Sequence, residues 1–400
     1  MTRIVKFYET TLRDGEQTPG INYFAEEKLE IARALADMGF DTLDCGFPIS
    51  GQPEFEAVQL IARNVSNAEI CAIGRAFRED VDRAWEAVKD AAQSSIQPFI
   101  STSPLHREHK LGKTRAEVLE MARATVARGR EHTPNIDFAL EDTTRTEHDF
   151  ILEVVGAIMK EGARFVTICD TVGYALPWEF GELIDEIRRE YPTVRISAHC
   201  HNDLGLAVAN ALTALQHGAE RADTCVNGLG ERAGNAATEE LVMAIRTRHE
   251  DLGLDVRVDT TKIVPTSRLV ARLSGMQPQW TKAIVGANAF AHGGGIHQDG
   301  VLKDARTYEI VRPEDIGLPA SDRRMFVGKL SGRAALNAQL RELGYELTPE
   351  QLGRAFVLVK NLLGKKKTLE EMDLRQCAAT AINPTAAVQA LEAEESAPAE

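Results

Sequence analysis

The chain has 400 residues, of which 44% are hydrophobic, and it carries a formal net charge of −14 at pH 7. This composition is typical of a globular protein with a sizeable core, and an α/β barrel accommodates about 250 residues in one domain. The negative charge argues against nucleic acid and anionic membranes as partners. No stretch approaches the roughly 18 apolar residues of a membrane span.

The N-terminus and the cysteines indicate where the protein works. The first residues run directly into an expected strand, so we expect no signal peptide. The six cysteines are scattered along the chain and form neither a disulfide framework nor a zinc-ribbon spacing. We therefore expect a cytoplasmic protein.

Short β-rich runs alternate with helical segments through about residue 250, and eight strands are expected. They cover residues 4–8, 42–47, 69–74, 96–101, 136–140, 165–169, 194–198 and 222–226. Glycines at 39, 162 and 218 precede the next strand and suit the left-handed position that ends a helix. Eight alternating units favour a parallel (β/α)8 TIM barrel. The alternative is a doubly wound sheet, but no Gly-x-Gly-x-x-Gly turn follows the first strand.

The alternation stops at about residue 275. Residues 281–310 are glycine-rich, and helical patterns return at about 332–344 and 349–364. From about 379 the chain is rich in Ala, Glu and Pro. We expect a catalytic barrel over 1–275, a linker and mainly helical extension over 276–375, and a disordered tail over 376–400.

Two histidines end the seventh expected strand. His199 and His201 are two residues apart, so they project from the same face of a strand and can bind one metal ion. Active sites of TIM barrels lie at the carboxyl ends of the strands, and strands seven, eight and one are neighbours in a closed barrel. Asp14 and Asn235 can therefore converge with the two histidines. One carboxylate, two imidazoles and an amide oxygen suit a divalent ion with positions open for substrate.

Each of these residues has a purely structural alternative. Asp14 can cap a turn, and the two histidines can be buried and hydrogen-bonded without a metal. Asn235 can cap the helix that follows it. Arg13, beside Asp14, can form a salt bridge with Glu141 or Asp44.

Several motifs resemble those of the 2-isopropylmalate and homocitrate synthases. This group of metal-dependent barrels also includes citramalate synthase and hydroxymethylglutaryl-CoA lyase. The resemblance covers residues 4–375, and its main motifs are Leu12–Gln17, His199–Gly205 and Asn227–Asn235. Further matches, closer to isopropylmalate synthase than to homocitrate synthase, are Gly46–Pro48, Ser101–Pro104, Asp170–Tyr174 and Gly295–Gly300.

The resemblance implies a metal centre and a reaction. Asp14, His199, His201 and Asn235 would hold Mn²⁺, Mg²⁺ or Zn²⁺. The ion would polarise a 2-oxo acid that chelates it, so that acetyl-CoA condenses with the keto carbon. Arg13 would donate to the keto oxygen and stabilise the alkoxide that forms there.

The resemblance also implies roles for residues around the metal. Thr171 and Asp44 would bind substrate, and Glu141 would position it or transfer a proton. His297 would remove a methyl proton from acetyl-CoA, with Tyr308 as its partner. In relatives this segment reaches the barrel of the other subunit, so a homodimer is implied. On sequence alone, the glycines before His297 equally suit a flexible linker turn.

Departures from the family pattern leave the 2-oxo acid open. Gly293-Gly294-Gly295 replaces the usual Glu-Ser-Gly, Leu330 replaces a histidine, and Asp44 replaces a glutamate. The small Ala139 leaves room for a side chain larger than that of pyruvate. We expect 2-oxoisovalerate, which gives 2-isopropylmalate.

Other functions stay open at this point. They are homocitrate synthase acting on 2-oxoglutarate, another alkylmalate synthase of a specialised pathway, a lyase that runs the reverse cleavage, and an inactive barrel that serves as a regulatory subunit. The chain stops before the C-terminal regulatory domain of full-length isopropylmalate synthases, so we expect no leucine feedback through that domain.

Overall fold

The computed structural model describes residues 2–384, which form two compact units. The first ends at Gly286 and the second begins at Ala287. The boundary therefore lies beyond the expected residue 275. The segment after α10 (Ile263–Ser274) stays with the first unit, because Lys282 forms ion pairs with Glu239 and Glu240 of that unit.

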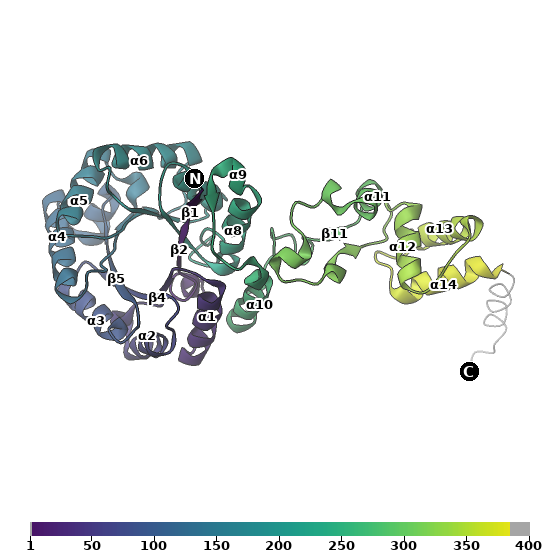
Figure 1. The fold of residues 1–400 in the computed structure, drawn as a ribbon, viewed down its shortest axis with the longest axis horizontal. Coiled ribbons are helices and arrows are strands. Elements are labelled where there is room, and N and C mark those ends of the chain that lie inside the picture. Colours follow the sequence, from purple (N-terminus) through teal and green to yellow (C-terminus); the bar gives the residue numbers. More distant parts are fainter. Residues whose placement is uncertain (1, 385–400) are drawn as a thin grey trace. The chain divides into compact units, whose positions relative to one another are not determined.

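A closed barrel of eight parallel strands forms the first unit (Figure 1). β2 pairs with both β3 and β9, which closes the ring and confirms the TIM barrel over the open sheet. The strands are β2 (Lys6–Glu9), β3 (Thr42–Asp44), β4 (Glu69–Arg75), β5 (Ser94–Ser101), β6 (Phe138–Glu141), β7 (Val166–Asp170), β8 (Ile196–Cys200) and β9 (Arg221–Thr224).

The first expected strand is divided in two. β1 (Arg3–Ile4) pairs with β10 (Leu254–Asp255) outside the barrel, and the barrel strand starts only at Lys6. Between them, the backbone N–H of Val5 donates to the carbonyl of Asp255. This short pairing anchors the start of the chain to the end of the barrel's sequence.

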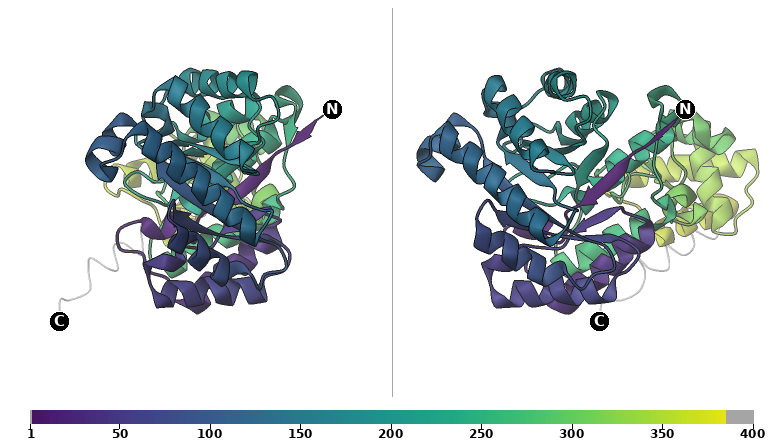
Figure 2. Two further views of the ribbon diagram at one scale, coloured as in Figure 1. Left: turned by 90° about the vertical axis from the view of Figure 1, so that its left-hand side faces the viewer. Right: turned by 60° about the vertical axis from the view of Figure 1, so that its left-hand side comes forward.

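Helices surround the strands, as the two views of Figure 2 show. The helices α1 to α8 turn an apolar face inward, and α1 ends at Gly39, whose positive φ of 91° confirms the expected left-handed cap. The helices are α1 (Ala25–Met38), α2 (Gln52–Asn64), α3 (Arg78–Val88), α4 (Arg115–His132), α5 (His148–Lys160), α6 (Pro177–Glu190), α7 (Ala207–Gln216), α8 (Thr238–Thr247) and α9 (His249–Leu252).

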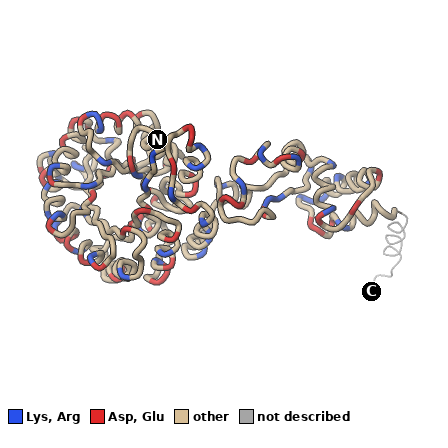
Figure 3. The backbone as a smooth tube through the Cα atoms, viewed as in Figure 1, with Lys and Arg blue, Asp and Glu red and all other residues tan. Residues whose placement is uncertain are grey.

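Many charged residues lie on these outer helices, where Lys and Arg are interspersed with Asp and Glu around the ring (Figure 3). Among the described residues, no helix combines the length and apolar character that a membrane crossing requires.

The second unit is mainly helical. β11 (Ala291–His292), which directly precedes α11 (Gly295–Lys303) in the sequence, forms a short parallel pair with β12 (Arg324–Met325). A separate hydrophobic cluster joins the last three helices, α12 (Arg333–Glu342), α13 (Pro349–Leu363) and α14 (Glu371–Ile382).

The expected start of the tail at 376 is wrong. α14 continues to Ile382, because Cys377, Ala378 and Ala381 are buried in the cluster with α13. The rest of the expected tail, residues 385–400, lies outside the described residues.

Candidate metal centre and active site

A cavity of about 300 Å³ lies among the residues at and after the carboxyl ends of the barrel strands. Polar and charged groups line one part of it, and apolar side chains line another. The lining includes six of the ten candidate site residues, which are Arg13, Asp14, Glu141, Thr171, His199 and His201. It also includes Phe47, Ile73, Phe99 and Ala139.

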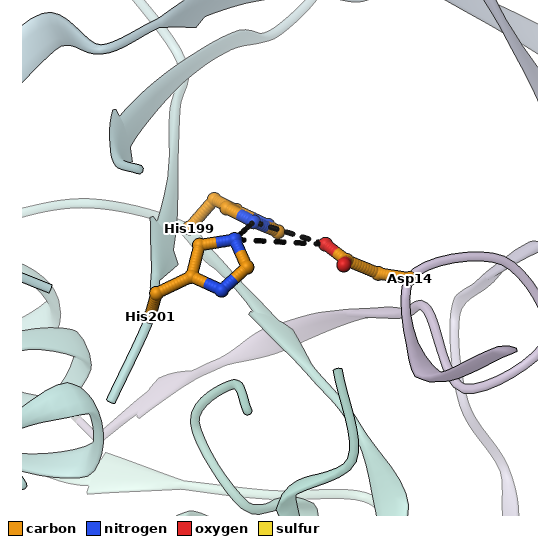
Figure 4. A group of neighbouring side chains, drawn as sticks. All are labelled: Asp14, His199 and His201. Atoms are coloured by element: carbon orange, nitrogen blue, oxygen red, sulfur yellow. Dashed lines mark hydrogen bonds and ion pairs between the residues drawn. The ribbon is translucent and has the colours of Figure 1, made fainter. Parts of the chain in front are cut away.

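Three buried side chains converge in this cavity (Figure 4). The Nε2 atoms of His199 and His201, from the end of β8, lie 3.2 Å apart. The Oδ2 atom of Asp14, from the loop after β2, lies 3.3 Å from Nε2 of His199 and 3.9 Å from Nε2 of His201. One ligand atom from each residue therefore faces a common point, which is the arrangement that a divalent cation needs.

The electrostatics of the three residues fit such a cation. Burial would raise the pKa of Asp14, but Arg13 and His199 hold it well below its usual range. Burial would lower the pKa of His199, but Asp14 and Asp223 raise it to about 9. Burial and the neighbouring His199 lower the pKa of His201 to about 4. At neutral pH Asp14 is thus anionic and His201 is neutral, so both can donate an electron pair to a metal, whereas His199 is protonated and must release a proton when a metal binds.

Asn235 lies beside this group. It forms a bridge with the backbone of His201, and its Nδ2 donates to the carbonyl of Leu229 at 3.0 Å. Its Oδ1 is buried and has no hydrogen-bond partner among the described residues. An orphaned buried oxygen next to two imidazoles and a carboxylate fits a fourth metal ligand.

Arg13 is held between two carboxylates. Its Nε donates to Asp44 Oδ2 at 2.8 Å, and its Nη1 lies 3.2 Å from Asp14 Oδ2. Thr10 also donates to Asp44 at 2.9 Å. Of the structural alternatives for Arg13, a salt bridge with Asp44 is present. Asp44 therefore contacts Arg13 rather than lining the cavity itself.

Glu141 and Thr171 reach the cavity from β6 and from the loop after β7. Glu141 pairs with Lys110, whose Nζ lies 2.7 Å from Oε1, and it accepts a hydrogen bond from Ser101. Thr171 Oγ1 accepts a hydrogen bond from the backbone N–H of Asp142 at 2.8 Å. Because that hydroxyl acts as an acceptor there, its own proton is free for another partner.

An apolar wall lies on another side of the cavity. Phe47, Ile73, Phe99 and Ala139 follow or belong to β3, β4, β5 and β6. In the ring order these strands are separated from β8 and β9 by β7 on one side and β2 on the other. The rings of Phe47 and Phe99 have their centroids 6.3 Å apart. The cavity thus has a polar, charged side and an apolar side.

Sequence reasoning missed two charged residues of this site, Lys110 and Asp223. Lys110 lies in a helical turn, His106–Leu111, and nothing in its neighbours' spacing connects it to Glu141. Asp223 is 2% exposed, and its Oδ2 lies 3.3 Å from Nδ1 of His199. The only signal for Asp223 in the sequence was an acidic side chain within the expected strand 222–226, and that signal does not show which face of the strand it occupies.

His297 and Tyr308 belong to the second unit. His297 lies in α11 and Tyr308 follows the turn Ala305–Thr307. Their rings have centroids 4.3 Å apart and are inclined by 31°. The structure therefore places the rings of His297 and Tyr308 next to each other.

Comparison with known proteins extends to both units. The HMGL-like family matches residues 4–270, and the homocitrate synthase post-HMGL domain-like family matches residues 284–367. The 2-isopropylmalate synthase of Dictyoglomus turgidum is 50% identical, over 92% of this chain and 73% of its own. The 2-isopropylmalate synthase 1 of Caldanaerobacter subterraneus subsp. tengcongensis is 49% identical, over 93% of this chain and 94% of its own.

Solved structures share the barrel. The hydroxymethylglutaryl-CoA lyase of Pseudomonas aeruginosa has a TM-score of 0.60 at 19% identity, over 70% of this chain and 95% of its own. The HMG-CoA lyase of Brucella melitensis has a TM-score of 0.56 at 20% identity, over 68% of this chain and 99% of its own. These similarities concern the fold alone. The family match to the barrel and the extensive identity to the synthases show that this chain belongs to the 2-isopropylmalate synthase branch of the HMGL-like family.

Proposed function

We propose that the protein is a cytoplasmic, metal-dependent acyltransferase that condenses acetyl-CoA with 2-oxoisovalerate to give 2-isopropylmalate, a step in leucine biosynthesis. The observation that carries this proposal is the convergence of Asp14, His199 and His201 in one cavity beside Arg13. The identity to 2-isopropylmalate synthases supports the choice of reaction.

Asp14, His199, His201 and Asn235 would hold Mn²⁺, Mg²⁺ or Zn²⁺. When bound, such an ion polarises the carbonyl of a chelating 2-oxo acid and makes its carbon electrophilic. The free electron pairs of His201 and of the Asn235 amide oxygen support this assignment.

The remaining steps follow from the chain's own groups. Arg13 keeps its positive charge between Asp14 and Asp44, so it can stabilise negative charge that develops on the keto oxygen. Thr171 can donate its free hydroxyl proton to the substrate carboxylate. Glu141, which Lys110 and Ser101 hold in place, can position substrate or transfer a proton.

The apolar wall supports 2-oxoisovalerate over 2-oxoglutarate. Phe47, Ile73 and Phe99 suit a branched hydrocarbon, and burial of such a group stabilises the complex. The distal carboxylate of 2-oxoglutarate would need a cation, and the lysine and arginines that line the cavity already pair with carboxylates of this chain. Lys110 pairs with Glu141, Arg232 with Asp203 and Arg13 with Asp44. Homocitrate synthase is therefore the less favoured reaction.

His297 is proposed as the base that takes a methyl proton from acetyl-CoA, with Tyr308 as its partner. The close approach of the two rings supports a joint role. Hydrolysis of the thioester that results makes the condensation irreversible. We propose a homodimer in which His297 of each subunit serves the barrel of the other.

A thiol-release assay tests the reaction. The enzyme is incubated with acetyl-CoA, Mn²⁺ and one 2-oxo acid from a panel of pyruvate, 2-oxobutanoate, 2-oxoisovalerate and 2-oxoglutarate. We expect the highest kcat/KM with 2-oxoisovalerate and no release from the Asp14→Ala variant. Comparable turnover of 2-oxoglutarate would contradict the proposed substrate, and no release with any acid would favour an inactive barrel.

A further inference from the structure

A chain of buried polar groups crosses the barrel interior and ends at His199. It begins at Arg221, which is only 1% exposed although its long side chain carries a positive charge. Its Nη1 donates to Asp137 Oδ2 at 2.8 Å, and its Nε donates to Ser197 Oγ at 2.9 Å. Burial of a charge is costly unless it is paired and hydrogen-bonded, so these contacts fix the position of Arg221.

Strand register explains why the next groups touch. Ser197 is directly opposite Arg221 in the pairing of β8 with β9, and His199 is directly opposite Asp223. Side chains two residues apart share a face of a strand, so both pairs point into the barrel, one above the other. The Ser197 hydroxyl accepts from Arg221 and donates to Asp223 Oδ1.

In this series of hydrogen bonds, each group donates to the next one toward His199. Arg221 can only donate, so Ser197 must use its single proton for Asp223. Oδ2 of Asp223 is buried and has no hydrogen-bond partner among the described residues, and it lies 3.3 Å from Nδ1 of His199, so it is free to accept the Nδ1–H. If Nδ1 keeps its proton when His199 becomes neutral on metal binding, the electron pair is on Nε2, the atom that faces Asp14 and His201.

The second histidine lacks such support. Nδ1 of His201 is buried and has no hydrogen-bond partner among the described residues. Among the described residues, a carboxylate therefore lies behind Nδ1 of His199, and no polar partner lies behind Nδ1 of His201.

We infer that Asp223, Ser197 and Arg221 are positioning residues that fix the tautomer and ring orientation of His199 and thereby set the affinity of the site for a divalent ion. The inference rests on the proposed metal centre. A carboxylate behind a metal-binding histidine changes metal affinity by about 10–100-fold when it is removed. A purely structural network would change the stability of the barrel and leave metal affinity unaltered.

Metal titration of the full chain tests the inference. Each protein is stripped with a chelator and titrated with Mn²⁺ alone, and free Mn²⁺ is measured by electron paramagnetic resonance. Asp223→Asn keeps the shape of the side chain, and we expect its dissociation constant to rise about 10–100-fold. Ser197→Ala removes only one hydroxyl, and we expect a rise of severalfold. Circular dichroism melts of the same samples report on folding.

Arg195→Gln is the matched control. Arg195 Nε pairs with Glu220 Oε2 at 2.9 Å at the amino ends of the same two strands, and both side chains are partly exposed. Arg195 stacks on the ring of Phe165, which Arg221 also contacts, but the structure gives it no hydrogen bond to Arg221, Ser197 or Asp223. Its dissociation constant should equal that of the wild type. If Asp223→Asn fails to fold, Ser197→Ala carries the test.

The outcomes separate the two proposals. If the wild type binds no Mn²⁺, the proposed metal centre is wrong. If the wild type binds Mn²⁺ and both variants bind it equally well, the metal centre stands and the positioning role is overturned. If only Asp223→Asn is weakened, the role ends at Asp223 and does not extend to Ser197 and Arg221.

Discussion

Arg13 lies between two buried carboxylates, so at the scale of single residues it has two separable effects. It neutralises Asp14 and Asp44, and it presents a cation to the place where the keto oxygen would lie. We predict that Arg13→Gln lowers kcat by about 10²–10³-fold, because a donor to the developing oxyanion is lost. Mn²⁺ affinity should be retained, since Asp14 keeps its carboxylate and loses a competing cation. Parallel thiol-release and Mn²⁺ titrations measure both, and a kcat within tenfold of the wild type would contradict the role.

Glu9 is a second residue with a predictable effect, on stability rather than catalysis. Burial raises its pKa to about 7, although Thr11, Thr238 and Val226 donate hydrogen bonds to its carboxylate. The folded state thus holds this proton more tightly than the unfolded state, whose pKa is near 4.5. The contribution of Glu9 to stability is complete below about pH 4.5 and is lost as the pH rises through about 7.

We therefore predict a difference in pH dependence between the wild type and Glu9→Gln. Between pH 4.5 and 8 the free energy of unfolding of the wild type should fall, relative to the variant, by on the order of 3 kcal/mol. The three tryptophans, at 85, 178 and 280, all lie in the first unit, so their fluorescence during urea unfolding reports on the barrel. Glu56→Gln, on the outside of α2, is the control. Parallel pH profiles for the wild type and Glu9→Gln would refute the prediction.

The convergence of Asp14, His199 and His201 was predictable from residues alone, given a barrel. Their strands are neighbours only if the sheet closes, and period-two spacing puts both histidines on one face. Asp223 was not predictable in the same way. The sequence does not show that Asp223 lies opposite His199, because that depends on the register of β8 and β9. Lys110 reaches Glu141 through a turn whose geometry the sequence pattern does not encode.

At the scale of elements, the loop between β9 and α8 determines where Asn235 lies. Gly230 has a φ of +144°, and a Cβ atom there would come within 2.1 Å of Nδ2 of Asn235. We predict that Gly230→Ala displaces the Asn235 side chain and weakens Mn²⁺ binding about tenfold.

Gly253→Ala separates this displacement from simple backbone strain. Gly253 also has a positive φ, of +61°, but a Cβ atom there would meet nothing within 4 Å. It should lower stability and leave Mn²⁺ affinity unchanged. Equal Mn²⁺ affinity in both variants would argue that Asn235 is not a ligand.

The elements themselves were largely predictable. Short β-rich runs between helical segments located all eight barrel strands, because the strands of a parallel barrel are buried on both faces. The exceptions have tertiary causes. Residues 3 and 4 leave the barrel to pair with β10, and the composition of residues 376–382 suggested a tail although these residues pack against α13. Neither contact can be inferred from the local amino-acid composition.

At the scale of the whole molecule, the proposed chemistry divides between the two units. Asp14 and its neighbours belong to the first unit, and His297 and Tyr308 belong to the second. Either Asp14→Ala or His297→Ala alone should therefore abolish turnover, for different reasons. Asp14→Ala should lose Mn²⁺ binding, whereas His297→Ala should keep it.

A mixed dimer tests whether His297 of one subunit acts on the barrel of the other subunit. The Asp14→Ala and His297→Ala chains are coexpressed with different affinity tags, and dimers that carry both tags are purified. If His297 serves the partner's barrel, one of the two sites combines an intact barrel with an intact histidine, and about half of the wild-type activity per dimer is expected. If His297 serves its own barrel, each site lacks one essential residue, so the mixed dimer would be as inactive as its parents. Recovery of activity from two inactive chains has no other simple source, because neither variant supplies both groups within one chain.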